Sequence, residues 1–243
     1  VDGTHPVPSE ANRDGTRRLL DLARAADDDT LVVVAATGGG SALLAAPVDG
    51  VPLADLRQLT AALVRSGAPI DRINAVRKHV SAVKGGRLAR ELAPATTVGV
   101  VFSDVTSDDP SVVASGPLSP DPTSYDDALT VLSAYGVDAP GSVTGHLQRG
   151  AAGEVGETPG PDDSAFDEVS VHILADNATA IAAAREVCTM AGFEPLVLSS
   201  SIRGESQAAA VTHVAVAEEV RRRGEPVEPP VAILSGGETT VAV

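Results

Sequence analysis

The sequence predicts an α/β fold, a Rossmann-like three-layer α/β/α arrangement around a mostly parallel sheet. Five short runs rich in Val, Ile and Leu recur along its 243 residues, and segments with helical periodicity separate them. Near-continuous apolar strands are typical of parallel sheets, because crossover helices cover both faces of such sheets. The predicted strands are 30–36, 96–102, 169–175, 194–199 and 230–235.

Helical patterns fill most of the intervals between these strands. Many of them begin after Asp, Ser or Asn, the residues that commonly cap helix N-termini. Residues 138–168 show no such pattern. They are rich in Gly, Pro and acidic residues and predict a long surface loop, a candidate flap. The predicted helices are 13–26, 53–66, 71–80, 86–92, 124–135, 177–191 and 205–223.

The chain is strongly acidic. It carries 33 Asp and Glu against 18 Lys and Arg, a formal net charge of -15 at pH 7. Such a charge repels nucleic-acid phosphates and anionic membranes, so an anionic ligand must be held by a local cluster of cations. Only Lys78 and Lys84 are lysines. An acidic, lysine-poor composition is typical of halophilic proteins, and a GC-rich genome gives the same bias.

The composition also bears on location. The single Cys188 excludes an internal disulfide, and no group of Cys and His has the spacing of a zinc site, so a cytoplasmic protein is expected. The longest apolar runs have the length of strands, and neither a membrane span nor a signal peptide is expected. The chain begins without Met and stops inside the strand-like run "TTVAV". We therefore expect a fragment of a longer protein.

Polar or glycine-rich segments follow the predicted strands. They read "TGGGS", "SDVTSDD", "DN", "SS" and "GGETT", and the last contains Glu238. Ligands of open α/β sheets bind beyond the carboxyl ends of the strands, so these loops form the candidate site.

The first of these segments is a glycine turn between a strand and a helix. Gly38, Gly39, Gly40 and Ser41 can present backbone N–H groups to a phosphate or carboxylate. The spacing fits neither the Walker A loop nor the dinucleotide fingerprint. Tight packing of strand against helix explains three consecutive glycines equally well, so both interpretations stay open.

The region 72–90 contains both lysines and no acidic residue. On a helical wheel, one stripe of this region carries three cations and two hydrogen-bonding side chains: Asn74, Arg77, Lys78, Ser81 and Lys84. A solvated helix face is the alternative. In this acidic protein, however, such a face would be expected to carry Asp and Glu. The stripe therefore predicts an anion-binding surface.

Two arginines and one histidine outside this stripe lead to further expectations. Arg87 and Arg90 open the next predicted helix, where the helix dipole does not favour cations, so an anion from outside is expected to hold them. His5, in "THPVP", is expected to face solvent.

Three carboxylates follow the second strand on one irregular loop. Asp104, Asp108 and Asp109 are candidate ligands of Mg²⁺, which favours one or two carboxylates together with substrate phosphates. Each can equally be a turn or helix cap. The adjacent "SGP" and "PDPTS" indicate a rigid loop with a specified conformation.

Six segments together resemble one family. In chain order they are "GTHPVPSEANRDG", "TGGGSALL", "INAVRKHVSAVKGGRLA", "SDVTSDDPSVVASGPLSPDPTS", "RGES" and "SGGETT", and they cover essentially the whole chain. They resemble the glycerate 2-kinase family, also called the MOFRL family. The resemblance implies that residues 1–243 are its Rossmann-like domain, without an N-terminal segment and a C-terminal MOFRL domain.

The resemblance also implies an activity. It is the ATP-dependent phosphorylation of D-glycerate to 2-phosphoglycerate with Mg²⁺. Lys84, Arg77 and Asp104 would be catalytic, with Asp104, Asp108 and Asp109 at the metal. Substrate or phosphate would be bound by Gly38, Gly39, Gly40, Ser41, Asn74, Lys78, Ser81 and Glu238. The partners would be D-glycerate and a nucleotide, and a homodimer is considered. The alternatives are an NAD(P)H-dependent hydroxypyruvate reductase and a non-catalytic ligand-binding fragment.

Overall fold

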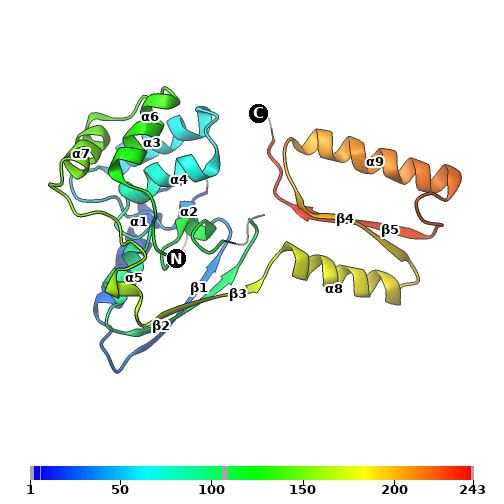
Figure 1. Ribbon diagram of the computed structural model, residues 1–243, viewed down its shortest axis with the longest axis horizontal. Coiled ribbons are helices and arrows are strands. Elements are labelled where there is room, and N and C mark those ends of the chain that lie inside the picture. Colours follow the sequence, from blue (N-terminus) through cyan, green and yellow to red (C-terminus); the bar gives the residue numbers. More distant parts are fainter. Residues whose placement is uncertain (1–2, 6, 106–108, 242–243) are drawn as a thin grey trace. The chain divides into compact units, whose positions relative to one another are not determined.

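The computed structural model describes residues 3–5, 7–105 and 109–241 (Figure 1). Within them the chain forms two compact units. Of the described residues, the first contains 3–5, 7–101 and 109–172, and the second contains 102–105 and 173–241.

A three-stranded sheet organises the first part of the chain. Its strands are β1 (Leu31–Thr37), β2 (Thr96–Phe102) and β3 (Val169–Ala175), in the order β1-β2-β3. The N–H of Thr97 donates to Glu168 O at 2.8 Å, and the N–H of Ser103 donates to Ala175 O at 2.8 Å. Both strands advance together between these bonds, so β2 and β3 are parallel.

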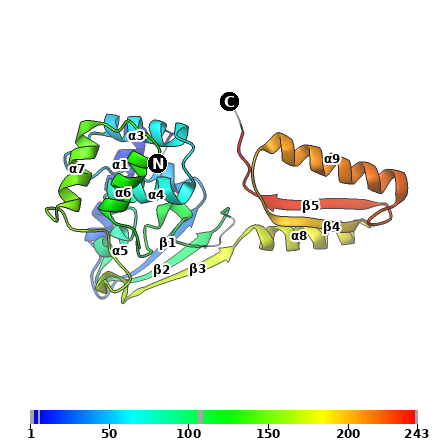
Figure 2. The ribbon, with the colours of Figure 1, turned by 45° about the horizontal axis from the view of Figure 1, so that its top comes forward.

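The second unit has a sheet of its own. β4 (Glu194–Ile202) and β5 (Val231–Gly237) pair in parallel, beginning with Glu194 opposite Val231. Figures 1 and 2 show α8 (Asn177–Met190) and α9 (Ser206–Arg223) on opposite faces of this pair. The α/β class with parallel strands is thus confirmed. The division into two sheets was not predicted, because backbone hydrogen bonding is the same for every strand and composition does not identify a strand's neighbours.

The remaining helices belong to the first unit. They are α1 (Glu10–Arg24), α2 (Gly40–Leu43), α3 (Leu53–Arg65), α4 (Ile70–His79), α5 (Arg87–Leu92), η1 (Val113–Ser115), α6 (Tyr125–Ala134), α7 (Gly141–Ala151) and η2 (Ser164–Phe166). No helix in the described ranges is both long and apolar enough to cross a membrane.

The prediction of a long loop over 138–168 was wrong. This region contains α7 and the short helix η2. Val143 and Leu147 are fully buried on α7, and Gly150 continues the same stripe at helical spacing. Glycines within the segment concealed this pattern, because glycine is a poor helix former in isolation.

Helices rather than the sheet surround the largest buried side chain. Tyr125, with no exposed surface, lies edge-on between His79 and His146, at ring-centroid distances of 4.7 and 5.6 Å. Leu59 and Leu63 of α3 belong to the same core. A chain with 2% aromatic residues thus uses one tyrosine as the centre of its helical core.

The contact between α6 and α7 can be tested with two glycines of one helix. A methyl group at Gly150 would lie 2.3 Å from the Tyr125 ring, whereas at Gly145 it would meet nothing within 4 Å. Gly150→Ala should lower the free energy of unfolding by about 1–3 kcal/mol through overpacking. Gly145→Ala should raise it by roughly 0.5–1 kcal/mol through helix propensity. Urea unfolding measures both, and equal effects of the two substitutions would refute this packing.

Candidate anion-binding site

The glycine turn connects β1 to the short helix α2. Gly39 has a φ of 78°, a left-handed conformation that favours glycine, and it is the N-cap of α2. Gly40 has no room for a side chain, because a Cβ there would lie 2.9 Å from Ala114 Cβ. The packing interpretation of these glycines therefore holds at Gly40. It does not exclude a ligand near Gly39 and Ser41.

Lys84 is buried, and its side chain reaches the glycine turn. It is 6% exposed, and its Nζ donates to the backbone oxygens of Ser41 (2.6 Å) and Leu44 (2.8 Å). No carboxylate among the described residues pairs with it. An ammonium has three N–H groups, so two carbonyls leave one donor unused.

Lys84 lies beyond the end of α4, whereas the helical wheel placed it on the same helix as Arg77. α4 ends at His79, and Ser81 forms an isolated antiparallel bridge with Pro47. The Ser81 hydroxyl accepts the N–H groups of Val83 and Lys84, both at 3.3 Å. Only part of the predicted stripe is therefore a helix face. The turn after α4 nevertheless brings Lys84 back towards α4.

Arg77 and Lys84 face a common cavity of about 190 Å³. Ser41, Ser81, Gly39 and His5 also line it, together with apolar residues of α2 and α3. The side chain of Arg77 makes no ion pair or hydrogen bond within the described part of the chain. Two cations without carboxylate partners at one small cavity are the arrangement expected of an anion site.

Burial disfavours the charged form of both cations. Burial, and secondly the charge of Arg77, lower the pKa of Lys84 from 10.5 to about 7. Burial also lowers the pKa of Arg77. The unfolded chain therefore holds the Lys84 proton more tightly than the folded chain does. The resulting loss of stability is complete below about pH 7 and disappears as the pH rises towards 10.5. A bound anion would stabilise the charged forms of Lys84 and Arg77 and would therefore raise both pKa values.

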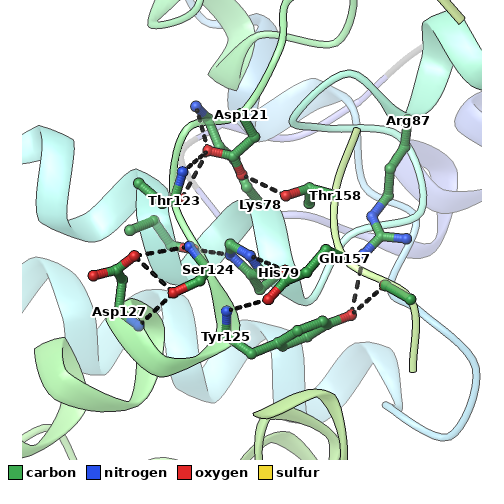
Figure 3. Close-up of polar contacts among 12 residues, drawn as sticks. Lys78, His79, Arg87, Asp121, Thr123, Ser124, Tyr125, Asp127, Glu157 and Thr158 are labelled. Atoms are coloured by element: carbon green, nitrogen blue, oxygen red, sulfur yellow. Dashed lines mark hydrogen bonds and ion pairs between the residues drawn. The ribbon is translucent and has the colours of Figure 1, made fainter. Parts of the chain in front are cut away.

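Lys78 has a different role from Lys84. Its Nζ lies 3.4 Å from Asp121 Oδ1, and the two side chains are 7% and 0% exposed. Figure 3 shows Asp121 also accepting hydrogen bonds from Thr123 and Thr158. Lys78 does not line the cavity. The ion pair instead connects α4 to the segment before α6.

Asn74 and Ser41 are connected through Ser115. The Ser115 hydroxyl donates to Asn74 Oδ1 at 3.1 Å and lies 2.7 Å from the Ser41 hydroxyl. Ser115 has no exposed surface. Sequence analysis did not select this residue. The only signal was the "SGP" segment, which indicated a specified conformation without identifying the side chain.

Arg90 has a carboxylate partner within the chain, so the expectation of an outside anion was wrong for Arg90. Arg90 pairs with Asp163 at 2.6 Å. The position of Arg90 on α5 is explained by its contacts with Glu157 and Asp163. Arg87 donates to the Tyr125 hydroxyl at 3.2 Å (Figure 3), and its Nε has no partner among the described residues. His5 is exposed, as expected, and it also lines the cavity.

Of the three predicted metal ligands, the structure describes Asp104 and Asp109. No group of three or more His, Cys, Asp or Glu in the described part of the chain could hold a metal ion. Asp109 accepts the N–H of Ser111 at 2.8 Å, which is the turn-cap interpretation. Asp104 is exposed and its backbone oxygen accepts from Asn177, while Asp108 lies outside the described residues. Glu238, also exposed, donates its N–H to Ile202 O.

A larger cavity of about 790 Å³ lies between α1 and β1. Apolar side chains such as Leu22, Leu31 and Val33 dominate its lining. It has no pair of unpartnered cations, so the smaller cavity is the better candidate for an anionic ligand.

Comparisons with known proteins identify relatives over the whole chain. A family model described as "Domain of unknown function (DUF4147)" matches residues 1–148. The chain is 36% identical over 245 residues to a glycerate 2-kinase of Pyrococcus horikoshii, covering 100% of this chain and 55% of that protein. It is 38% identical over 243 residues to a putative hydroxypyruvate reductase of Agrobacterium vitis, covering 100% and 54%.

A solved structure supports the similarity to glycerate kinases. The crystal structure of a glycerate kinase from Thermotoga maritima matches with a TM-score of 0.81 at 36% identity. The match covers 99% of this chain and 56% of that one. The chain thus spans about half the length of the curated relatives that it matches.

The Lys78–Asp121 pair can be compared with a surface pair by the same substitution. Asp121→Asn leaves a buried ammonium without its counter-charge and should lower the free energy of unfolding by about 3 kcal/mol or more. Asp163→Asn loses the partly exposed pair with Arg90 and should cost roughly 1 kcal/mol or less. Urea unfolding distinguishes the two. A similar cost for both variants would mean that the pair does not have this structural role.

Anion binding at the cavity should depend on pH through Lys84. Sulfate keeps its charge from about pH 6 to about pH 9, so it is a suitable probe. Lys84 is charged below its pKa of about 7 and must take up a proton on binding above it. The affinity for sulfate, measured by calorimetry, should therefore fall by about tenfold or more between pH 7 and pH 9.

Two variants test the origin of that pH dependence. Lys84→Arg keeps its charge at every pH and should remove the dependence, while His5→Gln should retain it. A dependence that survives in Lys84→Arg would assign the proton to another group.

Proposed function

The chain belongs to the family described as "Domain of unknown function (DUF4147)", its resemblance to glycerate 2-kinases is confirmed, and on this premise we propose that it carries the substrate-anion site of a D-glycerate 2-kinase. The reaction is the transfer of the γ-phosphoryl group of ATP to the 2-hydroxyl of D-glycerate. The product is 2-phosphoglycerate.

One observation supports this proposal most strongly. Arg77 and Lys84, with no carboxylate partner among the described residues, face one cavity in a chain of net charge -15. Burying cations in this way costs stability unless a ligand or partner compensates them. Retaining two of them at one cavity is explained by an anionic ligand that binds there.

The size of the cavity favours the acid substrate over the nucleotide. At about 190 Å³ it is smaller than the roughly 300–1,000 Å³ of pockets that enclose drug-sized ligands. A three-carbon hydroxy acid suits this volume. In the proposed complex, Lys84 and Arg77 neutralise the carboxylate, or the phosphate of the product, and fix its orientation.

The other predicted site residues keep their proposed roles around this centre. The backbone of Gly38 to Ser41 and the side chains of Asn74 and Ser81 position the anion. Lys78 contributes through its structural pair with Asp121. Phosphoryl transfer depends mainly on positioning and on neutralising charge, so such groups suffice on the acid side of the reaction.

ATP and Mg²⁺ are proposed cofactors. The described residues offer no cage of three or more ligands, and Mg²⁺ does not require one, because it binds through one or two carboxylates and substrate phosphates. Asp104 is the proposed ligand, with Asp108 and Asp109 as further candidates, and Glu238 is proposed to contact substrate or phosphate. Bound Mg²⁺ would neutralise phosphate charge during transfer.

The proposed partners are small molecules, namely D-glycerate and a nucleotide. A homodimer is compatible with the proposal. A cytoplasmic location is proposed because the chain has a single cysteine.

A hydroxypyruvate reductase is the alternative, and the name of the Agrobacterium vitis relative favours it. Such an enzyme needs a site for NAD(P). The turn "TGGGS" lacks the spacing of the dinucleotide fingerprint, and Gly40 packs against Ala114. The kinase is therefore preferred.

The two activities can be separated directly in the full-length protein. With D-glycerate and ATP we expect ADP release that depends on glycerate, and with hydroxypyruvate and NADH we expect no loss of NADH. Lys84→Met should lower kcat/KM by about 100-fold or more, because it removes a buried charge from the anion. Arg90→Met, a change on the exposed face of α5, is the control and should have little effect. NADH oxidation without ADP release would contradict the proposal.

A further inference from the structure

The turn around Ser115 has an unusual backbone. Ala114 and Ser115 have φ values of 52° and 62°, and they are the only non-glycine residues of the described ranges with positive φ. Gly116 follows with a φ of 61°. Residues other than glycine adopt this conformation at a cost, and such strain is concentrated at functional sites.

Ser115 contacts both parts of the anion site through its side chain. Its hydroxyl donates to Asn74 Oδ1 on α4, so the Ser41 hydroxyl is the donor of the 2.7 Å bond between the two serines. The proton of Ser41 is thereby directed away from the cavity and towards Ser115. α2 and α4 are thus held together by one hydroxyl group.

The backbone of the same turn holds the segment that carries Lys84. Ser115 O accepts the N–H of Gly85 at 3.0 Å, and Gly116 O accepts the N–H of Gly86 at 2.8 Å. Lys84 directly precedes these glycines, and its Nζ is bound to α2 through Ser41 O and Leu44 O. The Ser115 turn therefore fixes Lys84 at both ends: its backbone through Gly85, and its ammonium through α2.

We propose that Ser115 is a positioning residue, which holds the Lys84 ammonium at the distance from Arg77 that anion binding requires. Its left-handed conformation is retained because this geometry directs the hydroxyl to α2 and α4 while its carbonyl faces Gly85. This inference rests on the anion site of the proposed function. It adds to that function a residue that does not line the cavity.

A purely structural role would have a different signature. A buried serine that only fills space could be replaced by alanine with a change in stability and none in ligand affinity. A positioning residue changes the affinity, and it also changes the pH midpoint of binding, because the environment of the Lys84 ammonium depends on where α2 holds it.

The test compares Ser115→Ala, Ser115→Gly and Ser119→Ala in the whole protein, with sulfate as the probe. Ser115→Ala removes the hydroxyl and retains the strain. Ser115→Gly removes the hydroxyl and relieves the strain, since glycine adopts positive φ readily. Ser119, 9% exposed in the same segment, is a matched buried serine whose side chain takes no part in the hydrogen bonds between Ser41, Ser115 and Asn74.

Both Ser115 variants should bind sulfate about tenfold more weakly, because each loses one buried hydrogen bond that orders the site. The pH midpoint of sulfate binding should also shift in both variants. Ser115→Gly should unfold at a higher urea concentration than Ser115→Ala, which shows that the loss of affinity is separate from stability. Ser119→Ala should bind like the wild type. Wild-type affinity and pH midpoint in both Ser115 variants would overturn the inference.

Sulfate binding does not depend on phosphoryl transfer, so the two proposals can fail separately. A protein that binds sulfate in a Ser115-dependent way but does not phosphorylate glycerate would refute the kinase and leave the positioning role intact. Normal turnover together with normal binding in the Ser115 variants would refute the positioning role alone.

Discussion

The candidate anion site depends on one interaction, in which the Lys84 ammonium donates to two backbone oxygens of the glycine-turn segment. It connects the segment after β1 with the turn after α4, which lie 40 residues or more apart in the chain. A carboxylate in the same place would make a stable internal pair and leave no charge for a ligand. Carbonyl oxygens hold the ammonium in position without neutralising it, and this leaves both a free donor and an unmet charge at the cavity.

The two lysines show how one sequence region can divide between structure and binding. Lys78 and Lys84 belong to the same cationic stretch and are equally buried, at 6% exposed. Lys78 faces Asp121, whose other hydrogen bonds come from Thr123 and Thr158, so its charge is satisfied within the fold. Lys84 has Arg77 as its charged neighbour, and this repulsion adds to the effect of burial. The difference between the two arises from what each side chain meets after burial.

Sequence reasoning identified the elements well and their neighbours less well. All five strands form where the apolar runs predict them, with small shifts at their ends, because continuous Val, Ile and Leu runs leave few alternatives to a buried strand. α7 was missed because Gly145 and Gly150 obscured an apolar stripe that only the contact with Tyr125 explains. The helical wheel grouped Arg77 with Lys84 correctly, although the helix ends at His79 and a turn completes the arrangement. Ser115 could not be predicted, since its role follows from a backbone conformation that the sequence does not specify.

The central claim is that an anion in the cavity stabilises the charged form of Lys84, whose pKa is lowered to about 7 when the cavity is empty. Calorimetry of D-glycerate binding in two buffers of different ionisation enthalpy, near pH 8, measures the number of protons exchanged. The low pKa of Lys84 in the free protein predicts uptake of about one proton for each glycerate bound, and none in Lys84→Arg. Glycerate binding to the wild-type protein without proton uptake would contradict the account.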